Sequence, residues 1–172
     1  MDKRLQTKKA LKEVFVFLVK FNLLLLPFYA VIYFDINFYG LQAAFASFIG
    51  SILRLLGYSP QVSDIFIYVG DLPIDISRDC IGWKSMYSLL ALVLASPGKL
   101  KNKGKFLGIW IPSLLVLNVF RVLIIILIGL NFGVKVLEIT HKYIWQEIMI
   151  IAIIVIWYFW LKKVKKINKE RQ

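Results

Sequence analysis

The chain has 172 residues, of which 59% are apolar and 15% are aromatic, and its formal net charge at pH 7 is +12. Such a composition is typical of an integral membrane protein. The chain has one cysteine and no Cys-x-x-Cys motif, so we expect no disulfide, no bound metal and no other cofactor. Its cations lie in short runs that flank apolar segments, which argues against nucleic acid as a partner.

The apolar segments predict a single membrane domain with four spans, at residues 14–34, 81–97, 106–128 and 143–161. The first span follows a basic block and would be about 31 Å long as a helix. A cleaved signal peptide is the alternative for this segment, but its apolar core would be too long and no small-x-small cleavage site follows. We therefore expect an uncleaved anchor.

The segment 38–57 is long enough to span as well, but its pattern is amphipathic. The apolar residues on one helical face are Leu41, Phe45, Phe48, Ile52 and Leu55. The small and polar residues on the opposite face are Ser47, Gly50, Ser51 and Arg54. This pattern predicts an external helix that lies in the membrane interface.

The positive charges favour a multi-pass protein of the cell membrane with both termini in the cytoplasm. In this topology 15 of the 22 Lys and Arg residues are cytoplasmic, and the C-terminal residues 162–172 form a basic tail. The 15 are Lys3, Arg4, Lys8, Lys9, Lys12, Lys99, Lys101, Lys103, Lys105, Lys162, Lys163, Lys165, Lys166, Lys169 and Arg171. Residues 35–80 are then external, and the external side carries few cations, as the positive-inside rule expects. Its acidic residues are Asp35, Asp64, Asp71, Asp75, Asp79 and Glu138. A fifth span at 41–57 would place the 99–105 lysines and the C-terminal cluster outside.

Residues 61–78 predict a small external β-hairpin. The pattern alternates with period two over residues 64–69 and again over residues 72–76, and Gly70-Asp71 can form the turn between them. We interpret this hairpin as a cap over the helices. Addition of an extended peptide to its exposed edge is the alternative.

The only cysteine, Cys80, comes at the external start of the span 81–97. Unpaired helix N–H groups and the helix dipole favour a thiolate at such a position. Lys84, one turn later, adds positive charge, whereas Asp79 opposes it. Taken alone, a single cysteine at a membrane boundary is more often a small apolar filler than a nucleophile.

Two further residues strengthen a functional interpretation. Arg121 lies inside the third span, where a cation costs at least a few kcal/mol, and Asn118 is placed to orient its guanidinium. A buried ion pair with Glu147 is the structural alternative for Arg121. The only histidine, His141, marks the external entrance to the last span, where a hydrogen bond at the interface is the default role. We expect Cys80, Arg121 and His141 to converge on the outer membrane face.

At these positions the sequence resembles the exosortase/archaeosortase family of membrane cysteine transpeptidases. The family's Cys-x-Gly motif matches Cys80 and Gly82 in DCIGWKS. Its Asn-x-x-Arg motif matches Asn118 and Arg121 in NVFR, and its third site residue matches His141 in TH. Each motif comes at the outer edge of a successive predicted span.

The resemblance covers roughly residues 41–160 and includes LQAAFASFIGSILRLLGY, which is similar to the helix before the family's cysteine region. The chain has Ile81 where bacterial exosortases usually carry serine, and it lacks their additional spans. It therefore looks like a minimal, archaeal-type member.

The resemblance implies an enzyme that cleaves the C-terminal sorting signal of secreted proteins, a signal made of a motif, a transmembrane helix and a basic cluster. It implies that Cys80 forms a thioester, Arg121 stabilises the oxyanion and His141 transfers protons. The new C-terminus would pass to a membrane lipid or another surface amine. Lys84 and Arg78 are candidates for supporting roles at this site.

Three other functions remain open from the sequence. In a non-enzymatic membrane-complex subunit, Arg121 and Glu147 would form a structural pair and the thiol would be inert. A small-molecule transporter is disfavoured because the chain has neither repeats nor interrupted helices. An intramembrane protease would differ from a transpeptidase only in using water as its acceptor.

Overall fold

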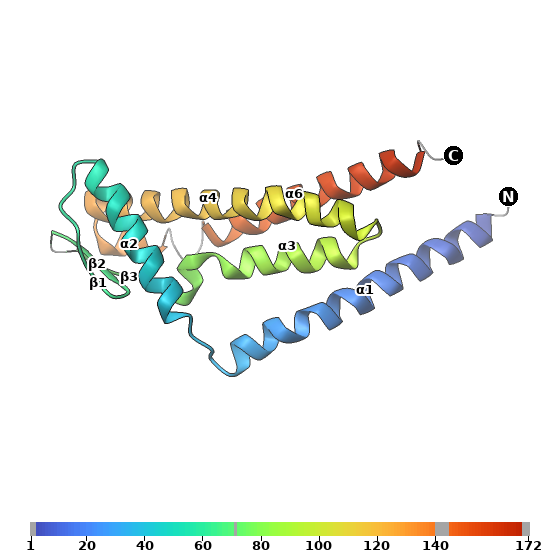
Figure 1. The fold of residues 1–172 in the computed structure, drawn as a ribbon, viewed down its shortest axis with the longest axis horizontal. Coiled ribbons are helices and arrows are strands. Elements are labelled where there is room, and N and C mark those ends of the chain that lie inside the picture. The colour runs from blue at the N-terminus through green and yellow to red at the C-terminus, as the bar shows by residue number, and fades with distance from the viewer. Residues whose placement is uncertain (1–2, 71, 140–144, 170–172) are drawn as a thin grey trace.

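The computed structural model describes residues 3–70, 72–139 and 145–169 and is mostly helical, with one small sheet (Figure 1). The helices are α1 Lys3–Tyr33, α2 Tyr39–Leu55, the 3-10 turn η1 Arg78–Ile81, α3 Trp83–Ala95, α4 Leu100–Phe132, α5 Val134–Ile139 and α6 Trp145–Lys169. The strands are β1 Gln61–Ser63, β2 Phe66–Val69 and β3 Leu72–Asp75.

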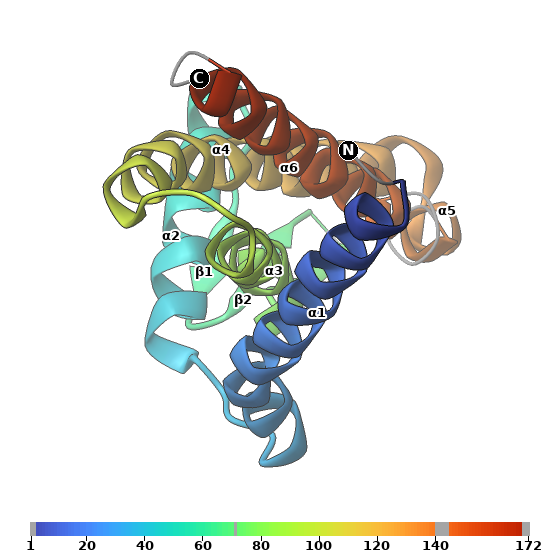
Figure 2. The same cartoon turned by 90° about the vertical axis from the view of Figure 1, so that its right-hand side faces the viewer.

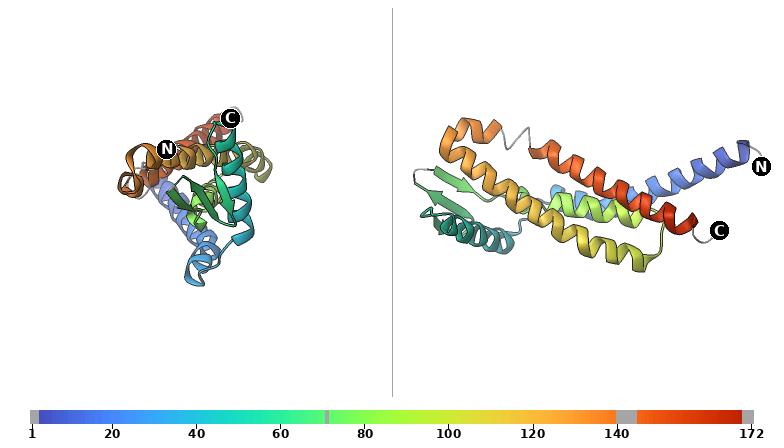
Figure 3. Two further views of the ribbon diagram at one scale, coloured as in Figure 1. Left: turned by 90° about the vertical axis from the view of Figure 1, so that its left-hand side faces the viewer. Right: turned by 90° about the horizontal axis from the view of Figure 1, so that it is seen from above.

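The two ends of the molecule differ in what they hold. Helices α1, α3, α4 and α6 run along the long axis, whereas α2 and the sheet lie together at one end (Figure 1). The N- and C-terminal helix ends lie at the opposite end, together with the connection from α3 to α4 (Figure 3). Helix α3 contacts α1, α4 and α6 and lies among them (Figure 2).

Among the described residues, two helical segments are long and apolar enough to cross a membrane. They are Leu11–Tyr33 in α1 and Leu100–Phe132. Helix α3 is apolar but has only 13 residues, which corresponds to about 20 Å. It is shorter than the expected segment 81–97 because Gly82 takes a left-handed φ of 79° before it and Ser96 is extended after it.

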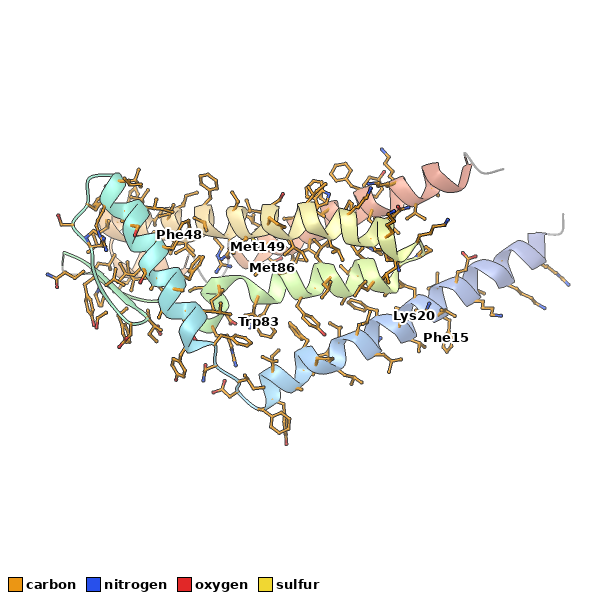
Figure 4. All side chains as sticks on the ribbon, in the orientation of Figure 1. Phe15, Lys20, Phe48, Trp83, Met86 and Met149 are labelled. Atoms are coloured by element: carbon orange, nitrogen blue, oxygen red, sulfur yellow. The ribbon has the colours of Figure 1, made fainter. Side chains whose placement is uncertain are left out.

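The interior of the bundle is an apolar cluster between α3, α4 and α6. Trp160 is fully buried in it, and Met149 of α6 and Met86 of α3 pack in the same interior (Figure 4). Tyr87 of α3 donates a hydrogen bond to the carbonyl of Leu24 in α1 at 2.7 Å. These contacts hold α3 in a fixed position in the bundle, and with it the turn that precedes α3.

The predicted hairpin is part of a three-stranded antiparallel sheet in the order β1-β2-β3. Strands β2 and β3 flank Gly70-Asp71 as expected, with Val69 paired to Leu72. The expectation of two strands was incomplete, because β1 adds a third strand whose Ser63 pairs with Phe66.

The face of α2 that packs inward includes Phe45 of the apolar face and Gly50 of the opposite face. Leu41, Phe48 and Leu55 of the expected apolar face are exposed. The buried residues are Gln42, Phe45, Ala46, Ile49, Gly50 and Leu53. The reason lies at Gly50, where a Cβ would be only 2.5 Å from a methyl group of Val62, so the glycine side of the helix is the one that can approach the sheet.

Candidate functional site

Cys80 lies in the turn η1, between the sheet and α3, and its side chain is 7% exposed. Its backbone N–H donates to the carbonyl of Ser77 at 2.9 Å, and its Sγ is 3.4 Å from the Ser77 hydroxyl. We had expected Cys80 in the first turn of the following helix. The left-handed Gly82 instead ends η1 and begins α3 at Trp83, so the thiol belongs to a separate turn.

Asn118 of α4 holds the backbone of this turn. Its amide nitrogen donates to the Cys80 carbonyl at 2.7 Å, and the side chain is 1% exposed. A Cβ at Gly82 would be 2.8 Å from the Asn118 amide carbon, so only glycine permits this approach. We had expected Asn118 to orient Arg121, but the described hydrogen bond goes to the cysteine backbone.

Arg121, one turn further along α4, contacts the same turn. A terminal guanidinium nitrogen donates to the Asp79 carbonyl at 3.3 Å, next to Cys80 in the chain. Arg121 is 8% exposed, and its buried Nε has no hydrogen-bond partner among the described residues. A buried donor without a partner is costly. An oxyanion next to the thiol would satisfy it.

The alternative pair between Arg121 and Glu147 is not formed. The ion pairs among the described residues join Arg78 to Asp35 at 3.1 Å and Lys84 to Asp79 at 2.7 Å. The Glu147 side chain is exposed. The structural role that a non-enzymatic subunit would give to Arg121 therefore has no support from this contact.

The two candidate supporting cations are paired with groups other than the thiol. Arg78 donates to the carbonyl of Ile36 at 3.0 Å and pairs with Asp35, so it ties η1 to the end of α1. Lys84 is 43% exposed and is neutralised by Asp79. Trp83 lies at the start of α3 (Figure 4) and packs against Phe28 of α1, with the ring centres 5.0 Å apart and the rings tilted by 37°.

A cavity of about 190 Å³ opens beside the thiol. Its walls come from β3, the turn to η1, α4 and α5. Its lining residues are Leu72, Pro73, Ile74, Asp75, Ile76, Ser77, Cys80, Val122, Ile125, Ile126 and Leu137. Cys80 lines this cavity although only 7% of the residue is exposed. A group bound in the cavity would therefore lie against the sulfur.

His141 lies outside the described residues, between α5, which ends at Ile139, and α6, which begins at Trp145. The expected convergence of three residues is therefore described for two, Cys80 and Arg121. Among the described residues no group of His, Cys, Asp and Glu could hold a metal ion.

Sequence reasoning missed two residues that shape the site. Ser77 contacts the Cys80 sulfur, and Gln42 of α2 donates to the Ile76 carbonyl at 2.9 Å where β3 leads into η1. The signal for Ser77 was its spacing, because a serine three residues before a cysteine faces it across one 3-10 turn. No local pattern distinguished Gln42, since its partner is 34 residues away.

Comparison with known proteins gives one match. A family model described as transmembrane exosortase matches residues 8–158 of this chain. Neither a curated relative nor a solved structure matches. The matched range includes every residue of the candidate site.

Proposed function

The chain belongs to the transmembrane exosortase family, and we propose that it is a membrane cysteine transpeptidase with Cys80 as the nucleophile. Membership of this family implies processing of sorting signals by a transpeptidase. The observation that carries the assignment of the nucleophile is the convergence of Asn118 and Arg121 on Cys80. From a helix about 40 residues away, Asn118 donates to the Cys80 carbonyl and Arg121 donates to the carbonyl of the preceding residue, Asp79.

We propose four spans, at residues 14–34, 81–97, 106–128 and 143–161, with the sheet and α2 outside. The arrangement of the two ends of the molecule supports this topology, because the lysine-rich start of α4 lies at the same end as the chain termini (Figure 3). The short α3 is compatible with a span, since irregular backbone at membrane depth is tolerated where protein surrounds it. Helix α3 has such surroundings from α1, α4 and α6.

The exposed apolar side chains fit the same arrangement. On α1 the outward residues include Phe15, Leu23 and Leu26, which are 67%, 60% and 59% exposed. In water such a surface would be unfavourable, whereas lipid is its natural solvent. The exposed Phe48 and Leu55 of α2 would likewise enter the interface.

In the first chemical step, the Cys80 thiolate attacks the scissile carbonyl carbon of the sorting signal. The carbonyl oxygen becomes an oxyanion that accepts hydrogen bonds from Arg121, whose free Nε supports this role. The C–N bond breaks as His141 gives a proton to the leaving amine. The products are a thioester on Cys80 and the released C-terminal helix.

In the second step, an amine of a membrane lipid or another surface molecule attacks the thioester. His141 accepts its proton, the C–S bond breaks and the thiolate is restored. Water in place of the amine would give plain proteolysis. Asn118, whose close approach Gly82 permits, holds the Cys80 carbonyl throughout, so that the thiol keeps its position relative to Arg121.

The test of this function is processing of a secreted reporter that ends in a sorting signal from a surface protein of the source organism. Co-expression with the unchanged chain should shorten the reporter, and the mass of the product should identify the acceptor. Cys80→Ala should abolish processing while the protein accumulates and melts as before. Processing that persists in the Cys80→Ala chain would exclude the mechanism.

The topology has its own test in the Cys80→Ala background. Gln61→Cys lies on the sheet and Lys101→Cys lies in the first turn of α4, and both side chains are exposed. A charged, membrane-impermeant maleimide added to intact cells should label the first and not the second. The reverse pattern would overturn the orientation.

A further inference from the structure

The outer edge of β3 leads to the thiol, and we propose that it binds the extended part of the sorting signal as an added strand parallel to β3. This inference rests on the proposed function, because it gives the binding mode of the same substrate. Three observations carry it: the main-chain groups on that edge, the cavity beside it, and the direction in which β3 runs.

The main-chain groups follow from the register of the sheet. Within the described residues, β3 is an edge strand whose only partner is β2. Bonded pairs recur at every second position of an antiparallel ladder. The Ile76 N–H donates to the Ile65 carbonyl at 2.9 Å, and Ile74 is paired with β2 two residues earlier. Pro73 and Asp75 therefore direct their main-chain groups toward the outer edge.

The residue types on this edge agree with that assignment. Proline has no N–H and is found in strands where this group would face away from the ladder. Pro73 thus offers only a carbonyl, whereas Asp75 offers both an N–H and a carbonyl. A strand placed next to β3 would pair with these three groups. Such pairing gives affinity without reading the sequence of the peptide.

The cavity supplies a place for one side chain of the peptide. It lies between β3 and α4, and its walls include Val122, Ile125 and Ile126 together with Leu137 of α5. A cavity of about 150 Å³ with apolar walls can hold a benzene molecule. The volume of about 190 Å³ thus fits one apolar side chain. Since Cys80 lines the same cavity, that side chain would belong to a residue close to the scissile bond.

The direction of β3 fixes the direction of the peptide. β3 runs from Leu72 to Asp75, and the chain continues from there toward Ser77 and Cys80. A sorting signal passes from its external motif, through the scissile bond, to a helix in the membrane. For the scissile bond to reach Cys80 with that helix beyond it, the motif must run alongside β3 in the same direction. The added strand is therefore parallel.

The same sheet can also act as a cap. Ile67 and Val69 of β2 are buried against α2 and α4, so the face of the sheet covers the helices. Peptide addition would use the edge and leave this face unchanged. The two roles use different parts of the sheet, so the packing of its face gives no reason to reject the edge as a binding site.

Disulfide cross-linking in the inactive Cys80→Ala chain tests the binding mode without chemistry. Pro73→Cys and Asp75→Cys place thiols on the edge, and Ser63→Cys on β1 is the control on the opposite strand. The probe is the secreted reporter with single cysteines at successive positions before its cleavage site. Neighbouring strands lie about 4.8 Å apart, within the Cα separation that a disulfide requires.

Asp75→Cys should cross-link about two reporter positions nearer the cleavage site than Pro73→Cys, and Ser63→Cys should give no cross-link. The reverse order would overturn the parallel arrangement. If neither edge cysteine cross-links while the unchanged chain processes the same reporter, the inference fails and the proposed function stands. Ordered cross-links together with processing by the Cys80→Ala chain would support the binding site and refute the proposed nucleophile.

A second measurement uses the active chain. Asp75→Pro removes the N–H that faces the edge, whereas Asp75→Ala retains it and removes only the carboxylate. Processing by Asp75→Pro should be about tenfold slower than by Asp75→Ala, as expected for one lost hydrogen bond and a bulkier edge. Equal rates in two chains of equal thermal stability would contradict the proposed pairing.

Discussion

The two ends of α3 are built in similar ways and yet differ in chemistry. Each end has a glycine with positive φ, Gly82 at 79° and Gly98 at 128°, and a Cβ at either would be 2.8 Å from a side chain of another helix. At Gly82 that side chain is Asn118, and at Gly98 it is Trp160.

The polar groups at the two ends are used differently. At the C-terminal end of α3, the indole N–H of Trp157 donates to the Ser96 hydroxyl at 2.8 Å and Lys103 donates to the Leu94 carbonyl at 2.8 Å. The indole N–H of Trp160 is buried there with no partner in the part of the chain that the structure describes, and it belongs to an apolar cluster. At the N-terminal end, the buried atoms with no partner among the described residues are Nε of Arg121 and Oδ1 of Asn118, on the two residues that donate to the main chain of Asp79 and Cys80.

The comparison indicates that close packing alone does not identify a site. Gly98 lets Trp160 pack into the apolar core, which stabilises the fold. Gly82 lets Asn118 hold the backbone of Cys80, and Arg121 has a buried donor in the same region with no partner among the described residues. Substitutions at the two ends should therefore separate stability from activity.

The largest effect is expected from Arg121→Gln. Removing one donor to an oxyanion typically costs a factor of about 10²–10³ in rate. The Arg121→Lys chain should be faster than the Arg121→Gln chain because it keeps the positive charge. It should remain slower than the unchanged chain because an ammonium group lacks the fixed planar N–H donors of a guanidinium. Processing rates per folded molecule measure both. A rate for Arg121→Gln within threefold of the unchanged chain would remove the oxyanion role.

The next largest effect is expected from Gly82→Ala, with Gly98→Ala as the matched comparison. Gly82→Ala and Gly98→Ala should each lower the free energy of unfolding by about 1–3 kcal/mol, because both adopt backbone conformations that alanine resists. Only Gly82→Ala should also slow processing per folded molecule, by more than tenfold, since it displaces Asn118. Thermal unfolding and reporter processing measure the two quantities. Equal activity loss in both chains would contradict the distinction between the ends.

Asn118→Ala should have a smaller effect, about tenfold in rate. It removes the donor to the Cys80 carbonyl, and leaving such a group without its partner costs about 1–3 kcal/mol. Asn118→Asp is the matched comparison, because it keeps the size and loses the donor, and it should be at least as slow as Asn118→Ala. Reporter processing measures both chains. A fully active Asn118→Asp chain would show that the hydrogen bond does not position the cysteine.

The smallest effect is expected from Lys84→Met. The pair of Lys84 with Asp79 is exposed on both sides, at 43% and 49%, and exposed pairs typically contribute about 0–1 kcal/mol. Processing should stay within about fivefold of the unchanged chain, and the same reporter measures it. A loss comparable to that of Arg121→Gln would mean that Lys84 acts directly on the thiol.

Much of the architecture could be predicted from local patterns. The turn at Gly70-Asp71 and its two flanking strands followed from alternation, and the long apolar helices followed from length and hydropathy. The membership in the exosortase family followed from three short motifs in order. These signals are local or depend on fixed spacing, so the sequence carries them directly.

Other features depend on contacts between distant segments. The inward face of α2 could not be predicted from its pattern, because it is set by the close approach of Gly50 to Val62 of the sheet. The three residues of β1 are too few to produce a pattern, and the hydrogen bond from Asn118 to Cys80 joins residues 38 positions apart. The role of His141 stays a prediction.

The most direct test of the account is a search for the acyl-enzyme. Purified protein in bilayers would be mixed with the sorting-signal reporter, quenched in acid, and its intact mass measured before and after treatment with hydroxylamine. The account predicts that the chain gains the mass of the reporter lacking its C-terminal helix, through Cys80, and that hydroxylamine removes it. Cleaved reporter without such an adduct, or the same adduct on the Cys80→Ala chain, would contradict a thioester on Cys80.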